Sequence, residues 1–192
     1  MTVEMHWPDH LLTLEDWIAL PEDSSRSYEL VEGVLVVSPK PVSQHQRAFL
    51  RLSAQLEPQL PPTLGVLADT EVLIDAGRLP TIRVPDIIVV PEAGINANLP
   101  RWNAADVLLA VEVLSPGSRR TDRVTKFFEY AEAGIDYYWL IDIDDPTSLA
   151  AYRLIDGDYE LVAEQSGQVT LDLAGTPITI DIAALTSSRA GQ

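Results

Sequence analysis

The sequence predicts an α/β fold with a mixed central β-sheet flanked by helices, and with additional β-hairpins. Residues 107–142 have the pattern strand, turn, helix, strand, which implies a right-handed crossover between two parallel strands. Two further β-type runs meet at Glu32-Gly33, a pattern typical of a tight hairpin with antiparallel strands. Parallel and antiparallel neighbours together indicate a mixed sheet.

Length and composition indicate one globular domain. The 192 residues are 46% hydrophobic and 22% charged, which is ordinary for a soluble domain with its own core. We expect a single domain over residues 1–192, with its core at about 13–143 and further β-structure at 147–185. No run is long and apolar enough to cross a bilayer, and residues 1–20 lack a signal-peptide pattern, so we expect a cytoplasmic protein without a membrane partner.

The charged and metal-ligating residues narrow the possible functions. Without cysteine, the chain has no disulfides, no thiolate chemistry and no Cys-ligated metal. Its histidines are too scattered for a recognisable metal motif, so any metal is expected to be an oxygen-liking ion such as Mg²⁺ or Mn²⁺. The net charge of −16 argues against broad nonspecific binding to nucleic acid, but leaves room for a local basic patch or a metal-neutralised site.

The N-terminal half is predicted to contain two helices, the hairpin and two strand regions. Thr13 and Asp16 fit a capping box at the start of a short helix. Residues 44–60 carry apolar side chains at helical spacing, and Pro61-Pro62 ends that helix. Strand patterns follow at 65–75 and 84–90. Residues 91–103 are rich in Pro, Gly and Asn and are predicted to form a mobile loop.

Residues 107–142 are the stretch around which the rest of the chain is organised. The first strand is too apolar to face water, and Ser115-Pro-Gly-Ser118 ends it. Thr121 fits the N-cap of the following helix and Gly134 its C-terminal stop. The helical spacing predicts four buried side chains, Val124, Phe127, Phe128 and Ala131.

Two acids stand in apolar strand contexts. Glu112 lies within VLLAVEVL and Asp86 leads the run PDIIVV. A buried carboxylate costs several kcal/mol unless a metal or a cation compensates it. If the two strands are neighbours, the carboxylates converge at one end of the sheet, where a divalent cation would relieve their repulsion.

Each of these residues also has a structural interpretation. Glu112 could form a buried ion pair with Arg83 or Lys126, and Asp86 could be a turn or capping residue. Lys126 shares a helix face with Asp122, four positions earlier, and could form a solvated bridge with it.

Arginines and aromatic residues leave similar alternatives. The only dense basic group, Arg119, Arg120 and Arg123, could contact a phosphate backbone or could pair with Asp122 and nearby acids. The aromatic run 137–139 and Trp102 could form a dimer surface, although a place in the core is favoured.

Three segments together resemble a known family. YELVEGVLVVSP, PDIIVV and VEVLSPGSRRTDRVTKFFEYAEAGIDYYWLID, in this order, are similar to the Uma2-type (DUF820) family of restriction endonucleases. That family is similar in turn to the PD-(D/E)XK nuclease superfamily. The resemblance covers roughly residues 13–143 and implies a restriction-endonuclease-like sheet flanked by helices, in agreement with the element order.

The resemblance implies roles for individual residues. Asp86 and Glu112 would hold Mg²⁺ or Mn²⁺ together with the Val113 carbonyl. The superfamily's lysine normally stands two residues after the acid, where this chain has Leu114. Its counterpart would be Lys126 on the following helix, which would position or activate the attacking water.

Two more matches complete the implied site. Glu29, in YELVEG, matches a further acid of the family's site and is counted among the catalytic residues. His45, at the start of the second helix, matches a histidine with an accessory role.

The implied function is metal-dependent hydrolysis of DNA phosphodiester bonds by an endonuclease. We expect a homodimer, since cutting both strands together requires two active sites. Two alternatives stay open. The chain could be a binding or assembly protein that keeps the fold without cutting, or it could hydrolyse RNA or another phosphate ester.

Overall fold

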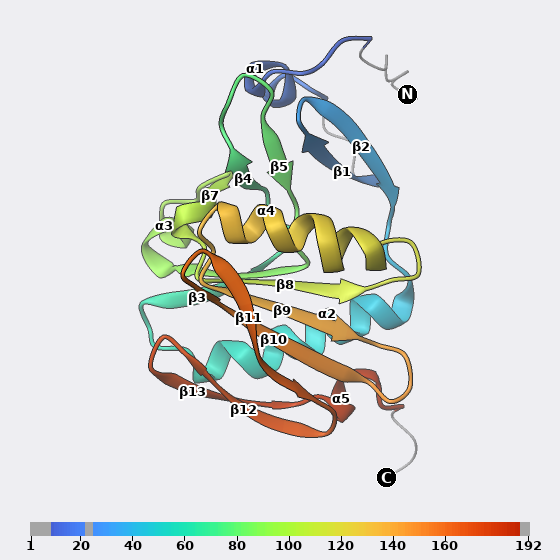
Figure 1. The fold of residues 1–192 in the computed structure, drawn as a ribbon, viewed down its shortest axis with the longest axis vertical. Coiled ribbons are helices and arrows are strands. Elements are labelled where there is room, and N and C mark those ends of the chain that lie inside the picture. The colour runs from blue at the N-terminus through green and yellow to red at the C-terminus, as the bar shows by residue number, and fades with distance from the viewer. Residues whose placement is uncertain (1–8, 22–24, 189–192) are drawn as a thin grey trace.

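The computed structural model describes residues 9–21 and 25–188, and its central feature is a six-stranded mixed sheet (Figure 1). The strand order is β11 (Asp158–Gln165), β10 (Ser148–Ile155), β9 (Tyr137–Asp142), β8 (Leu109–Leu114), β6 (Ile87–Pro91) and β3 (Leu64–Ala68). Strands β8 and β9 are parallel, as the predicted crossover requires, and the other neighbouring pairs are antiparallel. The predicted α/β fold class with a mixed sheet is therefore confirmed.

A second sheet lies above the first in Figure 1. Its order is β2 (Val34–Pro39), β1 (Arg26–Val31), β5 (Thr81–Arg83), β4 (Val72–Asp75) and β7 (Trp102–Asn103). The β1–β2 turn has positive φ at Glu32 (49°) and Gly33 (78°), as the predicted tight hairpin requires. Helix α1 (Leu14–Ile18) begins with the predicted Thr13–Asp16 capping box and buries Trp17 against this sheet.

Helices and a hairpin cover the two faces of the central sheet. Helix α4 (Lys126–Glu132) packs on the face of Ala110 and Leu114. Helix α2 (Ser43–Leu56) and the hairpin β12 (Gln168–Leu173)–β13 (Thr176–Asp181) pack on the opposite face, against Val111 and Val113. All six residues of β8 are buried, because both faces of this strand are covered.

The C-terminal segment contributes to the main core. Strands β10 and β11 extend the central sheet beyond β9, and the short helix α5 (Ala183–Thr186) contributes buried Leu185. In the described part of the chain, no helix is both long and apolar enough to cross a membrane.

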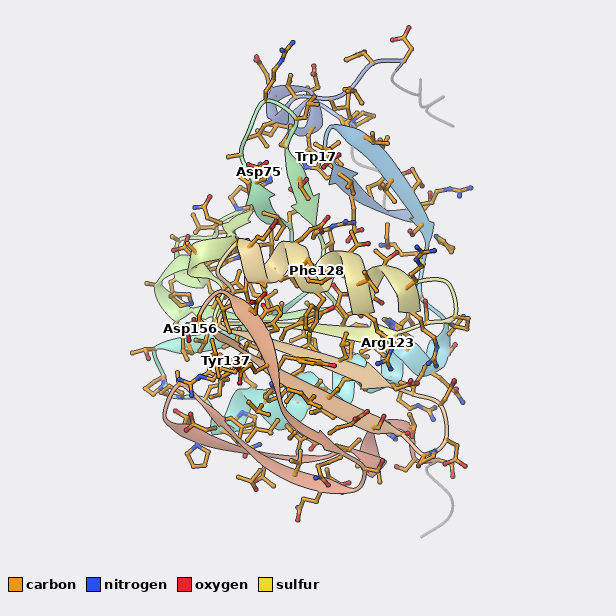
Figure 2. All side chains as sticks on the ribbon, in the orientation of Figure 1. Trp17, Asp75, Arg123, Phe128, Tyr137 and Asp156 are labelled. Carbon is orange, nitrogen blue, oxygen red and sulfur yellow. The ribbon has the colours of Figure 1, made fainter. Side chains whose placement is uncertain are left out.

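Two predictions of local structure were wrong. Residues 91–103 are not a continuous loop, because they include helix α3 (Glu92–Asn96) and strand β7, and Trp102 is only 2% exposed. The helix after β8 does not bury the predicted stripe, since Val124 is 48% and Phe128 58% exposed, and only Phe127 and Ala131 face inward. Phe128 lies on the outer side of α4 in Figure 2. The inner side of that helix carries polar residues, because the acid of β8 lies beneath it.

The aromatic run 137–139 and Trp102 belong to the core. Tyr137, Tyr138 and Trp139 are each at most 5% exposed. The dimer-surface interpretation of these residues is therefore wrong.

Candidate active site

Strand register brings the two predicted acids together. Strands β6 and β8 are antiparallel with Ile87 opposite Val111, so the next step of the ladder places Asp86 opposite Glu112. The Asp86 Oδ2 atom accepts a hydrogen bond of 2.7 Å from the backbone N–H of Val113. The predicted convergence of the two carboxylates at one end of the sheet is therefore present.

Glu112 is a compensated buried carboxylate. Its residue is 4% exposed, and its Oε1 accepts hydrogen bonds from Lys126 Nζ at 2.8 Å and from the Tyr130 hydroxyl at 2.9 Å. Burial raises the pKa of the Glu112 carboxyl well above its ordinary value, Lys126 opposes this effect, and the charges of Asp122 and Asp86 add to it.

A π-helical turn at Thr121–Thr125 directs Asp122 and Lys126 inward. Between Thr121 and Thr125 the helix widens, and the backbone N–H of Lys126 donates to the carbonyl of Thr121, five residues earlier. The carbonyl of Asp122, which this N–H would use in an α-helix, accepts a 2.9 Å hydrogen bond from the buried Tyr138 hydroxyl. The helix also begins earlier than predicted, at Arg119, so Thr121 lies inside it and is not its N-cap.

Lys126 reaches the acids. Its side chain is 8% exposed, and Nζ lies 2.8 Å from Glu112 Oε1, 3.0 Å from Glu29 Oε1 and 3.7 Å from Asp122 Oδ1. Burial alone would lower the pKa of the Lys126 ammonium, but these carboxylates outweigh it and raise the pKa. Lys126 is therefore a buried cation, and the interpretation as a solvated bridge to Asp122 is wrong.

The second sheet supplies Glu29 and its partner. Arg83 donates to Glu29 Oε2 at 2.9 Å and, through two nitrogens, to both carboxylate oxygens of Glu129. Burial would raise the pKa of Glu29, but Lys126 and Arg83 together lower it. The suggested ion pair between Glu112 and Arg83 is wrong, because Arg83 binds two other acids.

His45 and Asp69 flank Asp86. His45 is 5% exposed and its Nε2 lies 3.2 Å from Asp86 Oδ2. Burial would lower the His45 pKa, but the Asp86 carboxylate outweighs it and raises the pKa. Asp69 adopts a left-handed backbone (φ 50°), and its N–H donates to the Asp86 carbonyl at 3.3 Å. Burial and Asp86 raise the pKa of the Asp69 carboxyl.

Asp122 is buried without a hydrogen-bond partner. It is 1% exposed, and neither side-chain oxygen makes a hydrogen bond. Burial raises the pKa of its carboxyl, and Lys126 and the nearby Ser118 hydroxyl oppose this shift. Sequence reasoning placed this side chain on a solvated helix face, because it assumed regular α-helical geometry.

The predicted nucleic-acid contacts are largely engaged within the chain. Arg119 holds both oxygens of Asp142 at 2.7 and 2.9 Å, and Arg123 reaches the same carboxylate at 3.3 Å. Figure 2 shows Arg123 at the edge of the molecule where β9 ends. Arg120 is exposed. Pairing with nearby acids therefore accounts for two of the three arginines, with Asp142 as their partner instead of Asp122.

The acids outnumber the cations in this cluster. Four carboxylates, from Glu29, Glu112, Asp122 and Glu129, contact the two permanent cations Arg83 and Lys126, and Asp86 adds a fifth beside His45. If every carboxyl is ionised and His45 is neutral, three negative charges are left uncompensated. Across residues 9–21 and 25–188, no three His, Asp or Glu side chains are arranged so that they alone could hold a metal ion.

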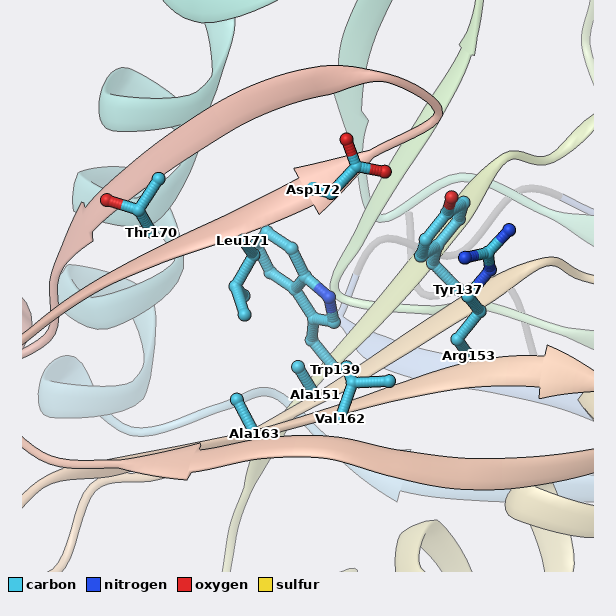
Figure 3. A pocket seen from close by; sticks show the side chains of 9 residues that line it. All are labelled: Tyr137, Trp139, Ala151, Arg153, Val162, Ala163, Thr170, Leu171 and Asp172. Atoms are coloured by element: carbon cyan, nitrogen blue, oxygen red, sulfur yellow. The ribbon is translucent and has the colours of Figure 1, made fainter.

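A separate pocket lies on the opposite face of the sheet (Figure 3). Its volume is about 230 Å³, and its lining includes Tyr137, Trp139 and Arg153 from the central sheet and Asp172 from β12. Tyr137 and Trp139 share their face with Leu109 and Val111, whereas Glu112 points to the other face. This pocket is therefore not part of the acid cluster.

Comparisons with known proteins agree with this architecture. A solved structure that matches is the "crystal structure of a putative nuclease belonging to DUF820" from Anabaena variabilis, with a TM-score of 0.70 and 21% sequence identity, covering 91% of this chain and 97% of that chain. At this identity the likeness shows the fold. The comparison with curated proteins found no match.

A family model gives the assignment. The model described as "Uma2: Putative restriction endonuclease" matches residues 14–184. This range includes most of the chain and every residue of the acid cluster. The protein therefore belongs to the Uma2 family.

Proposed function

We propose that this protein is a metal-dependent endonuclease that hydrolyses DNA phosphodiester bonds at the acid cluster. The observation that carries the proposal is the buried meeting of Asp86, Glu112 and Lys126 at one end of the central sheet. These are two acids and a lysine, the residue types that the nuclease resemblance implies. The membership of the Uma2 family supports the same reaction class.

The cluster fits a divalent cation in its charge and donor chemistry. Its donors are carboxylate and carbonyl oxygens, which Mg²⁺ and Mn²⁺ prefer, and its excess of carboxyl groups over cationic side chains favours a cation. Asp86, Glu112 and the Val113 carbonyl would hold the ion. Mg²⁺ usually keeps several waters and takes oxygens from a phosphate substrate, so few protein ligands are needed.

Each residue around the ion has a separate task. When bound, the ion would polarise a phosphoryl oxygen and lower the pKa of the attacking water. Lys126 is kept protonated by its carboxylates, so its ammonium would hold that water and offset the charge that develops on the phosphate. Tyr130 fixes the Glu112 carboxylate, and Arg83 fixes Glu29 beside Lys126. His45 contacts Asp86 and would orient its carboxylate.

The test compares metal binding and cleavage in matched variants. Mn²⁺ is titrated calorimetrically into the wild type, into Asp86→Asn and into Asp158→Asn, whose exposed acid is the first residue of β11. All three are then incubated with supercoiled plasmid and with RNA. We expect binding and metal-dependent nicking of the plasmid by the wild type and Asp158→Asn, and loss of both in Asp86→Asn.

Other outcomes would contradict parts of the proposal. Binding without cleavage of either nucleic acid would favour a binding or assembly protein on the same fold. Cleavage of RNA alone would make RNA the substrate instead of DNA. Absence of Mn²⁺ binding would exclude the metal-dependent reaction. The homodimer stays a prediction, and light scattering of the purified protein checks it.

A further inference from the structure

Packing alone does not explain the environment of the Asp122 carboxylate. Its carboxylate is almost fully buried, yet neither oxygen makes a hydrogen bond. Buried polar groups are normally paired, because leaving water without a new partner is unfavourable. Its printed neighbours are the Lys126 ammonium at 3.7 Å and the Ser118 hydroxyl, so the carboxylate can accept a closer cation in another state of the site.

The nearest cation is already close. Lys126 Nζ lies 3.7 Å from Asp122 Oδ1, while the same ammonium is bonded to Glu112 at 2.8 Å and to Glu29 at 3.0 Å. A shift of about 1 Å would bring the Lys126–Asp122 distance into the range of a charge-assisted hydrogen bond. The π-helical turn and the hydrogen bond from Tyr138 to the Asp122 carbonyl hold the Asp122 backbone in place for such an exchange.

A metal ion would force this exchange. The ammonium and a divalent cation would compete for the Glu112 carboxylate, and their like charges repel each other strongly in a buried site. Displaced from Glu112, the ammonium would need another acceptor to stay in the site. Among the carboxylates that contact Lys126, Asp122 is the one whose oxygens make no hydrogen bond of ordinary geometry.

We propose that Asp122 is a positioning residue that receives the Lys126 ammonium when a divalent cation takes Glu112. The inference rests on the proposed metal-dependent function. In the loaded site Lys126 bridges Glu29 and Asp122, stays charged, and keeps its place beside the phosphate. By binding the ammonium, Asp122 thus lets a metal ion bind Glu112 while Lys126 stays in the site.

The composition of the chain makes Lys126 easy to observe. The sequence contains only two lysines, Lys40 and Lys126, and Lys40 is exposed. In protein with isotope-labelled lysine, the side-chain NMR signals of Lys126 are assigned by their persistence in Lys40→Arg. Mg²⁺ is diamagnetic and is titrated into the wild type and into Asp122→Asn, which keeps the shape of the side chain and removes its charge.

The expected result has two parts. In the wild type, Mg²⁺ displaces the Lys126 ε-signal, and in Asp122→Asn this displacement is lost or clearly reduced. The Mg²⁺ affinity measured by calorimetry falls about tenfold in Asp122→Asn, as expected for loss of one hydrogen bond to a charged group.

A double-mutant cycle separates positioning from direct metal ligation. In a Lys126→Met background, Asp122→Asn leaves Mg²⁺ affinity unchanged if Asp122 acts through the lysine. A further loss of affinity in that background would make Asp122 a metal ligand and overturn the proposal. If Lys126→Met does not fold, the NMR comparison decides alone.

The remaining outcomes distinguish the inference from the proposed function. If Mg²⁺ binds and the Lys126 displacement is the same in wild type and Asp122→Asn, the inference is wrong and the metal-dependent function stands. If calorimetry detects no Mg²⁺ or Mn²⁺ binding to the wild type, the proposed function and the inference both fail.

Discussion

Replacing Glu112 by glutamine tests whether the buried acid serves stability or chemistry. Removing one partner of a buried ion pair typically costs about 3–5 kcal/mol, because the other charge is left unpaired. Here Lys126 keeps Glu29 at 3.0 Å and Asp122 at 3.7 Å, so it is not left alone. The glutamine carbonyl can still accept from Tyr130. We therefore expect Glu112→Gln to change the free energy of unfolding at neutral pH by less than about 1 kcal/mol, or to raise it.

The pH dependence of the free energy of unfolding gives the sign of this effect independently. Burial raises the pKa of Glu112 in the folded chain above its ordinary value of 4.5, so the folded state binds this proton more tightly than the unfolded state. The resulting stabilisation is fully present below pH 4.5 and is lost as the pH rises through the folded pKa. Each unit of raised pKa corresponds to about 1.4 kcal/mol, and glutamine does not titrate.

Urea unfolding of the wild type, Glu112→Gln and the exposed control Glu160→Gln, at pH 4.5 and pH 8, measures both effects. The advantage of glutamine over glutamate is expected to grow with pH, while Glu160→Gln follows the wild type. Nicking and Mn²⁺ binding should be lost in Glu112→Gln alone. If Glu112→Gln unfolds more easily at pH 8 by about 3 kcal/mol or more, Glu112 is a structural ion-pair partner and the reasoning is refuted.

Three further predictions concern the lysine, the helix turn and the basic group. Lys126→Met removes the cation that pairs with Glu29 and Glu112, so the free energy of unfolding is expected to fall by about 3 kcal/mol or more. Urea denaturation measures this change, and an unchanged value would contradict the buried ion pairs. Tyr138→Phe leaves the Asp122 carbonyl without this donor and is expected to cost about 1–3 kcal/mol by the same assay. Arg120→Ala is expected to lower the slope of log affinity for DNA against log salt by about one, measured by fluorescence anisotropy, and an unchanged slope would exclude a phosphate contact.

The sequence made the two strand acids visible, but not the geometry between them. Glu112 and Asp86 could be found because each interrupts or leads an apolar run, where a carboxylate needs a reason. Their convergence depended on β6 and β8 being neighbours, which local patterns do not specify. Lys126 was a candidate partner of Glu112 from its place in the next helix, whereas only the family resemblance connected Glu29 to the site.

Asp122 and Tyr130 were missed for a different reason. Hydrophobic periodicity selected Val124 and Phe128 as buried, because a helix normally turns its apolar side inward. Here the π-helical turn and the acid beneath it turn Asp122, Lys126 and Tyr130 inward instead. Their spacing of four residues is visible in the sequence, but nothing local shows that this polar stripe is the buried one.

Composition also misled the prediction for residues 91–103. Pro, Gly and Asn favour a loop, and the packing of Trp102 against the helix overrides that preference. A Cβ atom on Gly94 would clash with the Trp102 ring, so only glycine lets the indole pack this closely on α3. In this segment glycine reflects close packing instead of chain freedom.

The Arg83 contacts have a consequence for how the site comes into being. This side chain on β5 joins Glu29 on β1 to Glu129 on α4, and Glu29 and Lys126 are 97 positions apart in the sequence. The charge cluster therefore exists only when the sheet that contains β1 and β5 is packed against helix α4. An unfolded or half-assembled chain carries the same acids but does not hold them together. Ligand capture at this cluster is thus a property of the completed fold, and it would reinforce that fold by mass action.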